Sequence, residues 1–399
     1  MNYSDIYGAE PGEVIRPATT EEVRAAVAHA WGAGGGVLPW GGGTGQDYGY
    51  PPRRADYLLD LSGLNRVVAH EVDDLTITVQ PGVTFADLQN TLAARNQYLP
   101  LDPPQPERAT IGGALATNAF GPSRIGHGTA RDWLIGLSVV DAQGRVIRGG
   151  GKVVKNVTGY DLPKLHIGAL GTLGVIVEAT FKVAPKPEAH RTVLVRRGAA
   201  SGSVGAFVRQ ALEETAPAKA YLHSGESGSF AIFGFAGPVE VVEDAVGRVR
   251  AAADRHLAGQ PGLTLNVFEE DLEHEAPDAP LALRFACPPA DAFAQHEATC
   301  AGVGDAGAAQ VETLLGVGVT SVFWPAADAG AQEVADALRH LAREQGRSCA
   351  VLRAPLAFRA RPEVDLWSPL PPSFPLMERM KATLDPDGVL NPGRFVGRL

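Results

Sequence analysis

Cysteine is scarce in this 399-residue sequence, and its scarcity argues against three kinds of structural site. The three cysteines, Cys287, Cys300 and Cys349, lie far apart, and none belongs to a C-x-x-C pair. Their odd number and wide spacing argue against a disulfide framework, an iron–sulfur cluster and a structural zinc site. We interpret them as reduced, buried side chains.

Positive charge and long apolar runs are lacking as well. Lys and Arg number 35 against 45 Asp and Glu, for a formal net charge of −10, so the chain is unsuited to nucleic acid. No stretch of about 18 uncharged apolar residues occurs, and the first residues show no basic segment followed by an apolar run. We expect a cytoplasmic protein that reaches the inner face of a membrane only through its partners.

Glycine and proline, in contrast, are abundant, with 47 and 30 residues, and the densest glycine cluster is "PWGGGTGQ" at 39–46. A Rossmann fingerprint fails on spacing, because Gln46 stands where the third glycine is required. A Walker A loop fails because valine follows Lys152. Two interpretations remain: a tight structural turn, or a nest of backbone N–H groups that binds a diphosphate.

Hydrophobic periodicity predicts two regions that differ in the order of their helices and strands. A helix starting at Thr19 or Thr20 and the short strand "GVLPW" lead into the glycine cluster, and two further strands and the helix "TFADLQNTLAARN" follow. The turn-rich stretch after residue 101, with one short helix at "IGGALATN", is long enough to be functional. From about 190 to 365, strands alternate with helices, which is typical of an α+β sheet covered on one face.

Five separated segments, in this order along the chain, closely resemble the FAD-binding domain of the vanillyl-alcohol oxidase family, also called the PCMH-type flavin domain. They are "PWGGGTG", "PERATIGGALATN" at 106–118, "GHGTARDWLIG" at 126–136, "KNVTGYDLPKLHIGALGTLGVIVEATFKVAP" at 155–185, and "LDPDGVLNPGR" at 384–394.

The resemblance implies an α+β fold. A PCMH-type FAD-binding domain of two subdomains would span 1–186, and a smaller α+β domain with a ferredoxin-like sheet, for the substrate or for docking a partner, would span 187–365. A C-terminal segment, 366–399, would return to the flavin domain.

The resemblance also implies FAD as the cofactor, with its pyrophosphate on the glycine cluster. The matching cofactor-binding positions are Gly41, Gly42, Gly43, Thr44, Gly45, Thr110, Gly112, Gly113, Asn118, Gly128, Arg131, Asp132, Gly171, Gly174, Ile176, Asn391 and Arg394. For Arg131 and Asp132, an ordinary buried ion pair is the alternative. Family members that bind FAD covalently use a histidine beside the glycine cluster or a cysteine in the later loop, and neither is present, so the FAD is expected to be non-covalent.

The second region offers no recognisable catalytic group. Relatives that dehydrogenate D-2-hydroxy acids carry the motif H-x-G-D-G-N-x-H, which is missing here. The histidines after residue 190 are isolated in the sequence, so we predict no metal site and leave the catalytic base unknown. Arg353 is a candidate carboxylate clamp, with a surface salt bridge as the alternative.

A flavin domain without that motif resembles the short flavoprotein subunits of bacterial glycolate oxidase complexes. This resemblance implies oxidation of glycolate to glyoxylate together with a larger FAD-binding subunit and an iron–sulfur subunit that receives the electrons. Two alternatives stay open: a free-standing FAD-dependent dehydrogenase of another 2-hydroxy acid or alcohol, and a non-catalytic scaffold subunit stabilised by its flavin.

Overall fold

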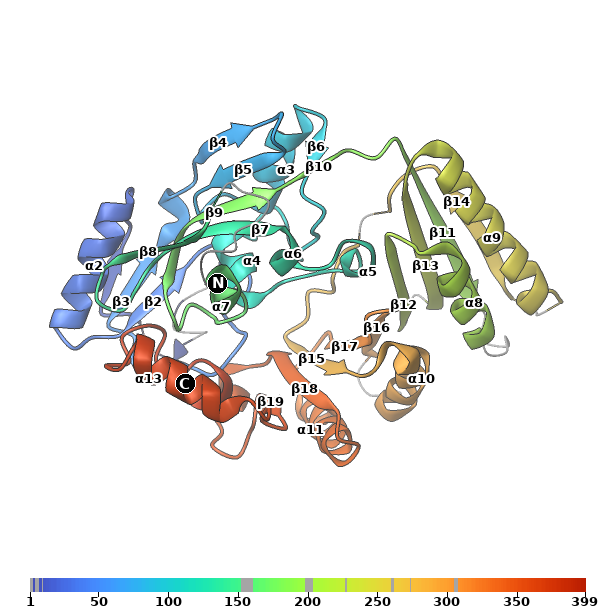
Figure 1. Cartoon of the computed structure of the whole chain (residues 1–399). Coiled ribbons are helices and arrows are strands. Elements are labelled where there is room, and N and C mark those ends of the chain that lie inside the picture. Colours follow the sequence, from blue (N-terminus) through green and yellow to red (C-terminus); the bar gives the residue numbers. More distant parts are fainter. Residues whose placement is uncertain are drawn as a thin grey trace. The chain divides into compact units, whose positions relative to one another are not determined.

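The computed structural model divides the chain into two compact units (Figure 1). The first unit comprises residues 1–120, 129–186 and 354–399, and the second comprises residues 121–128 and 187–353. The structure describes residues 3, 7–8, 10–151, 161–197, 204–226, 228–259, 262–272, 274–304 and 308–399. Lys152, considered above for a Walker A loop, and Tyr160, in the segment 155–185 that resembles the flavin domain, lie outside the described residues.

A three-stranded parallel sheet opens the first unit. Its order is β1 (Glu13–Ile15), β3 (Tyr57–Asp60) and β2 (Val37–Trp40), and helix α2 (Thr20–Gly32) connects β1 to β2. The Thr19 side chain accepts a hydrogen bond from the Glu22 amide and so begins α2. Val23, Val27 and Ala30, spaced three or four residues apart, face the core.

A five-stranded antiparallel sheet forms the other half of this unit. Its order is β4 (Val67–Glu71), β5 (Thr76–Val79), β9 (Val175–Lys182), β7 (Leu134–Val140) and β8 (Val146–Gly150). Helices α3 (Phe85–Ala93) and α4 (Ile111–Thr117) share one apolar core with this sheet. Strand β9 also sends Val175 and Val177 into a second core, together with α2, β2 and β3, so it joins the two halves.

The C-terminal segment returns to the start of β2. After helix α13 (Phe374–Leu384), the Val389 carbonyl accepts a hydrogen bond of 2.7 Å from the Val37 amide, and the Asn391 amide donates to the Val37 carbonyl at 2.9 Å. Val389 and Leu390 are buried in the core of the parallel sheet. The strand that leads into the glycine cluster is therefore fixed by residues some 350 positions away in the chain.

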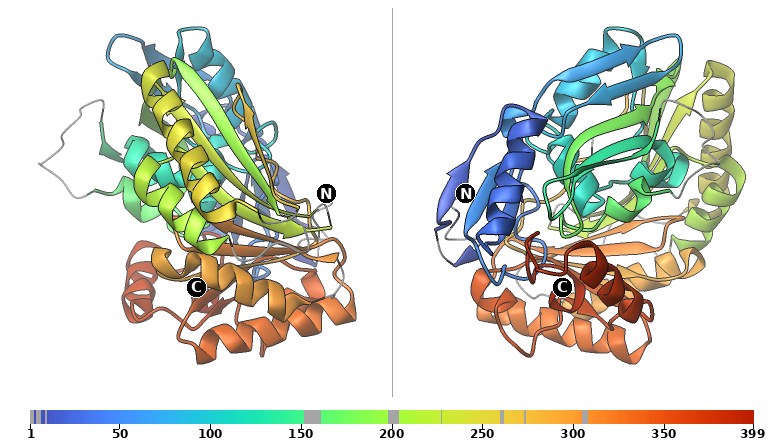
Figure 2. Two further views of the ribbon diagram at one scale, coloured as in Figure 1. Left: turned by 90° about the vertical axis from the view of Figure 1, so that its right-hand side faces the viewer. Right: turned by 60° about the vertical axis from the view of Figure 1, so that its left-hand side comes forward.

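The second unit is built on one antiparallel sheet. The strand order is β14 (Thr264–Phe268), β11 (Ala189–Arg197), β13 (Gly228–Gly237), β12 (Lys219–Gly225), β16 (Gln310–Leu314), β17 (Val319–Trp324), β15 (Leu281–Ala286) and β18 (Ser348–Arg353). Helices α8 (Gly205–Thr215) and α9 (Val239–Leu257) lie on the same side of β11 and β13 and share their apolar core (Figure 2). Helix α10 (Ala292–Val303) packs on β16, and α11 (Ala329–Glu344) packs on β15 and β18.

Short elements complete both units. They are η1 (Leu61–Gly63), β6 (Gln97–Tyr98), α5 (Arg124–His127), α6 (Ala130–Trp133), α7 (Pro163–His166), β10 (Ala184–Pro185), η2 (Pro289–Asp291), α12 (Leu356–Arg359), β19 (Trp367–Ser368) and η4 (Val396–Arg398). Within the residues that the structure describes, no helix is both long and apolar enough to cross a bilayer.

The sequence pattern did not predict several strands and one helix of the second unit. The sequence predicts helices at 203–214, 238–257 and 331–344, and α8, α9 and α11 agree with them to within about two residues. Strands β14, β16 and β18 and helix α10 have no counterpart among the elements that the sequence predicts. Strand β16 has the sequence "QVETL", with a glutamate in its middle. A charged residue inside a short segment breaks the apolar alternation by which a strand is recognised.

The core of the second unit gives a stability prediction. Phe233 is fully buried and its ring packs edge-on against Phe207 at 5.8 Å between centroids, so Phe233→Ala should lower the free energy of unfolding by about 3–5 kcal/mol. Val241 on α9 is 62% exposed, and Val241→Ala should stay within about 0.5 kcal/mol of the parent. Urea unfolding of both variants checks this, and equal losses would contradict the placement of this core.

Candidate cofactor-binding site

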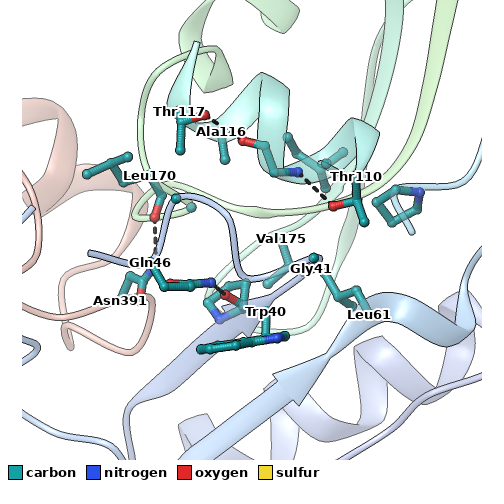
Figure 3. A pocket seen from close by; sticks show the side chains of 18 of the residues that line it. Trp40, Gly41, Gln46, Leu61, Thr110, Ala116, Thr117, Leu170, Val175 and Asn391 are labelled. Carbon is teal, nitrogen blue, oxygen red and sulfur yellow. Dashed lines mark hydrogen bonds between the residues drawn. The ribbon is translucent and has the colours of Figure 1, made fainter. Parts of the chain in front are cut away.

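A pocket lies in the first unit between the glycine loop, which we define as residues 41–45, and helix α4 (Figure 3). It encloses about 700 Å³ when the adjoining space open to solvent is included. The described lining residues are Pro39, Trp40, Gly41, Gly42, Gly43, Thr44, Gly45, Gln46, Leu61, Pro81, Thr110, Gly112, Gly113, Ala116, Thr117, Leu170, Gly171, Gly174, Val175, Ile176, Asn391 and Arg394.

The glycine loop approaches the segment around α4 too closely for side chains. A Cβ added at Gly42 would collide with the backbone carbonyl oxygen of Arg108, and one at Gly41 would collide with Thr110 Oγ1. A Cβ at Gly45 would lie 2.8 Å from a methyl carbon of Thr117. Glycine is therefore required by contact at these positions, and the wall of the pocket here consists of main chain.

The main chain of the loop offers hydrogen-bond donors. Among the described residues, no acceptor pairs with the amides of Gly42, Gly43, Thr44 or Gly45. Buried or half-buried amides normally find a partner. A row of unpaired amides beside a pocket is the arrangement that binds the oxygens of an anion such as a diphosphate.

Arg394 supplies the positive charge of the pocket. It is 2% exposed, and its Nη2 donates to the carbonyls of Gln46 at 2.7 Å and Tyr48 at 2.8 Å. Its Nη1 donates to Gln46 Oε1 at 2.6 Å, while its buried Nε has no partner in the described part of the chain. Of the described lining residues it alone carries a charged side chain. A buried cation bonded to neutral carbonyls favours an anionic ligand.

Gln46 closes the base of the loop. Its Nε2 donates to the Pro39 carbonyl at 3.1 Å, and its Oε1 accepts from Tyr7 Oη at 2.8 Å as well as from Arg394. Burial raises the pKa of Tyr7, which the nearby Arg394 partly opposes, so Tyr7 stays a neutral donor. The side chain of Gln46 is thus used within the protein and holds the loop in shape.

The opposite walls come from α4, the turn before β9 and the C-terminal segment. Thr110 begins α4, since its Oγ1 accepts from the Gly113 amide at 3.3 Å. The Leu170 amide donates to the Ala116 carbonyl, and the Leu170 carbonyl accepts from Asn391 Nδ2 at 2.5 Å. Asn391 Oδ1 is buried without a partner among the described residues.

Most of the seventeen cofactor positions implied by the sequence come together in this pocket. Those that line it are Gly41, Gly42, Gly43, Thr44, Gly45, Thr110, Gly112, Gly113, Gly171, Gly174, Ile176, Asn391 and Arg394. Lining residues that the sequence did not single out include Trp40, Gln46, Leu61, Pro81 and Val175. These are ordinary core or turn residues by type, and only the fold reveals their place.

Four implied positions lie elsewhere. Asn118 is the left-handed C-cap of α4, and its buried Oδ1 has no partner in the described chain. Gly128 ends helix α5 in the second unit. Asp132 accepts from the Thr129 amide at 2.8 Å and caps α6, while Arg131 donates to the Lys164 carbonyl at 3.1 Å; both are exposed, and their role toward FAD stays a prediction.

A second polar cluster lies in the second unit. His223 on β12 and His274 in a loop contact opposite oxygens of Glu312 on β16, at 3.4 Å and 3.0 Å. Burial raises the pKa of Glu312, but the hydrogen bonds from both histidines outweigh it, so the net pKa is lowered and the carboxyl is ionised. The three residues are 38 to 89 positions apart, which is why their sequence spacing did not reveal the cluster.

Other candidates for catalysis have simple partners. Arg353 forms an ion pair with the exposed Asp278 at 3.1 Å, which is the salt bridge that the sequence left open. His296 lies within 3.0 Å of both Ser224 and Thr313. Over the described residues, no group of three His, Cys, Asp or Glu side chains is arranged to hold a metal ion.

Comparison with known proteins identifies the class of the pocket. Residues 11–150 match the family model of the FAD binding domain. The chain is 37% identical over 188 residues to the glycolate oxidase subunit GlcD of Bacillus subtilis, which covers 47% of this chain and 40% of that protein. It is 38% identical over 132 residues to the subunit GlcE of Escherichia coli, covering 33% of this chain and 38% of that protein.

A D-2-hydroxyglutarate dehydrogenase of Xanthomonas citri is 35% identical over 185 residues, 46% of this chain and 39% of that protein. The chain thus spans about two fifths of the length of these relatives.

Solved structures resemble almost the whole chain. An alkyldihydroxyacetonephosphate synthase superposes with a TM-score of 0.69 over 96% of this chain and 77% of its own, at 18% identity. The 4-ethylphenol oxidase of Gulosibacter chungangensis, in its isoeugenol complex, superposes with a TM-score of 0.73. The match covers 98% of this chain and 91% of the oxidase, at 16% identity. These values confirm the predicted fold, a PCMH-type FAD-binding domain joined to a smaller α+β domain.

FAD is therefore the cofactor of this chain. The pocket fits it on independent grounds: unpaired loop amides, one buried cation, and the unpaired Oδ1 of Asn391 suit a ligand that combines a diphosphate with polar ring systems. Among the described residues, those that would hold the diphosphate are Gly42, Gly43 and Gly45 with Arg394.

The close contact at Gly42 gives a binding prediction. Gly42→Ala places a methyl group against the Arg108 carbonyl, so the loop must shift, and the FAD dissociation constant should rise about 100-fold, which corresponds to about 2.7 kcal/mol. Gly247→Ala is the control, because Gly247 lies on the exposed side of α9 with no atom in reach of a Cβ. Titration of both apoproteins with FAD measures the difference, and equal affinities would refute the steric argument.

His166 gives a pH prediction. It is 8% exposed, packs against Gly174, and burial lowers its pKa from 6.5 to about 4. As the pH falls, the unfolded state therefore binds a proton at His166 before the folded state does. The free energy of unfolding is unaffected above about pH 6.5 and decreases by about 3 kcal/mol as the pH falls toward 4. His166→Leu removes this loss, so the free energy of unfolding should decrease less in the variant than in the parent between pH 7 and pH 4. Urea unfolding of both proteins across this pH range measures the difference. If the free energy of unfolding depends on pH equally in both, the lowered pKa of His166 is wrong.

Proposed function

We propose that the chain is an FAD-dependent oxidoreductase that acts on 2-hydroxy acids, and more specifically the GlcE-type subunit of a glycolate oxidase complex. The observation that carries the proposal is the pocket of the first unit. It is supported by the similarity of the chain to the glycolate oxidase subunits GlcD, 37% identical over 188 residues, and GlcE, 38% identical over 132 residues. When bound, FAD supplies the two-electron redox chemistry by which glycolate becomes glyoxylate with loss of two electrons and two protons.

The chain's own residues bind and orient. The glycine loop and Arg394 fix the diphosphate, while Leu61, Val175 and Ile176 add apolar surface to the pocket. Ala, Thr and Gly on the facing side of α4 leave room for a flat ligand. Because the loop is main chain and Arg394 is held by carbonyls, these groups have little side-chain freedom to lose when a cofactor binds.

Electrons have to leave the site after each turnover. Among the described residues, Cys287, Cys300 and Cys349 form no disulfide. Burial raises the pKa of Cys349 to about 12 and also raises that of Cys287, so neither is a ready thiolate ligand. This supports a partner protein as the electron acceptor. We propose a larger GlcD-type FAD subunit and a GlcF-type iron–sulfur subunit as the partners.

Anaerobic spectroscopy tests the proposal. The purified chain should show the absorption of oxidised FAD, and glycolate should bleach it only after both partner subunits are added. Bleaching by glycolate without partners would instead make the chain a free-standing dehydrogenase. A flavin that stays oxidised while the complete complex turns over would make it a scaffold subunit. D-Lactate and D-2-hydroxyglutarate serve as comparison substrates, and faster bleaching by either would reassign the substrate.

A further inference from the structure

A buried lysine links the C-terminal helix to two walls of the cofactor pocket. Lys381 lies on α13, and its side chain is 12% exposed. Its Nζ donates to Asp385 Oδ2 at 2.5 Å, to the Thr172 carbonyl at 2.8 Å and to the Leu390 carbonyl at 2.9 Å. All three donors of the ammonium group are therefore used, each on a different acceptor.

The partner carboxylate is equally occupied. The side chain of Asp385 is fully buried. Its Oδ1 accepts a hydrogen bond from the Val389 amide at 2.8 Å, and its Oδ2 accepts one from the Leu390 amide at 2.9 Å. One ion pair thus fixes the turn from residue 385 to 390, which pairs with Val37 at the start of β2, the strand that leads into the glycine loop. Burial lowers the pKa of Lys381, and Asp385 opposes that shift.

Neither Lys381 nor Asp385 lines the pocket, but the residues next to the two carbonyls that Lys381 binds do. Thr172 follows Gly171, and Leu390 precedes Asn391; Gly171 and Asn391 line the pocket. Asn391 Nδ2 in turn holds the Leu170 carbonyl, in the same turn whose Thr172 carbonyl Lys381 holds. The ion pair therefore sets the separation between the turn at 170–172 and the C-terminal segment.

Stability alone does not account for such a pair. Removing two charges from water costs several kcal/mol, and well-packed apolar residues of similar size often stabilise a fold as well or better. What an ammonium group adds is geometry, because it holds three acceptors at fixed distances from one point. That is useful where two backbone segments must keep the spacing that a ligand requires.

We propose that Lys381 and Asp385 are positioning residues for FAD, which hold the two walls at the spacing of the bound cofactor and thereby control its retention. This inference rests on FAD as the cofactor and is independent of the substrate. The proposal concerns the affinity for FAD. It can therefore be wrong while the proposed oxidation of glycolate is right, and it can be right while glycolate is not the substrate.

The test compares Lys381→Met with Arg379→Met in the full chain. Arg379 lies on the same helix and is exposed, so its replacement removes the same charge without touching the pair. Lys381→Met should raise the FAD dissociation constant at least about tenfold and change the visible circular dichroism of the bound flavin, while Arg379→Met should change neither. If Lys381→Met only lowers the melting temperature of the apoprotein, with affinity and dichroism at the parent values, the proposal is wrong.

A measurement on the parent protein guards against a variant that does not fold. The amides of Val389 and Leu390 are bonded to Asp385, and neither residue lines the pocket. If the pair couples them to the cofactor, addition of FAD to the apoprotein should slow their hydrogen exchange at least about tenfold. Exchange at both amides that is unaffected by saturating FAD would overturn the proposal, and amides of α9 in the second unit serve as the reference.

Discussion

The contact between two backbones, at residues 41–45 and 108–117, sets the terms for the whole first unit. Because no Cβ fits between Gly42 and the Arg108 carbonyl, this part of the pocket has to work through main-chain amides. The charge that an anionic cofactor needs cannot then come from the loop itself. It comes from Arg394, which reaches the loop from the far end of the chain and is bonded to its base through Gln46.

This arrangement makes the pocket a long-range structure. Its glycine loop follows β2, the first residue of which is paired with Val389 and Asn391, and its other walls come from α4 and the turn at residues 170–172. The apolar core beneath it likewise combines α2, β9 and the C-terminal Leu390. None of these segments can hold a cofactor alone. The site is complete only when residues 1–120, 129–186 and 354–399, the three segments of the first unit, have met.

The sequence predicted the cofactor pocket better than the second unit, and the reason is physical. Close approach at Gly42 and Gly112 and the left-handed backbone at Asn391 each restrict the residue type at one position, so they leave a trace in the sequence. By contrast, β16 and the cluster around Glu312 depend on neighbours that only the folded sheet provides. Arg131 and Asp132 are exposed and do not line the pocket; Asp132 caps α6 and Arg131 donates to the Lys164 carbonyl, so their role toward FAD stays a prediction.

The same contrast explains why the substrate is the hardest property to infer. A main-chain site can be shared by proteins that oxidise different hydroxy acids, and the relatives of this chain include subunits of glycolate oxidase as well as D-2-hydroxyglutarate and D-lactate dehydrogenases. The matched stretches span less than half of the chain, whereas the fold is similar over nearly all of it. Under the proposed function, side chains rather than the main-chain loop would select among hydroxy acids, because backbone amides contact only the cofactor part that all these reactions have in common.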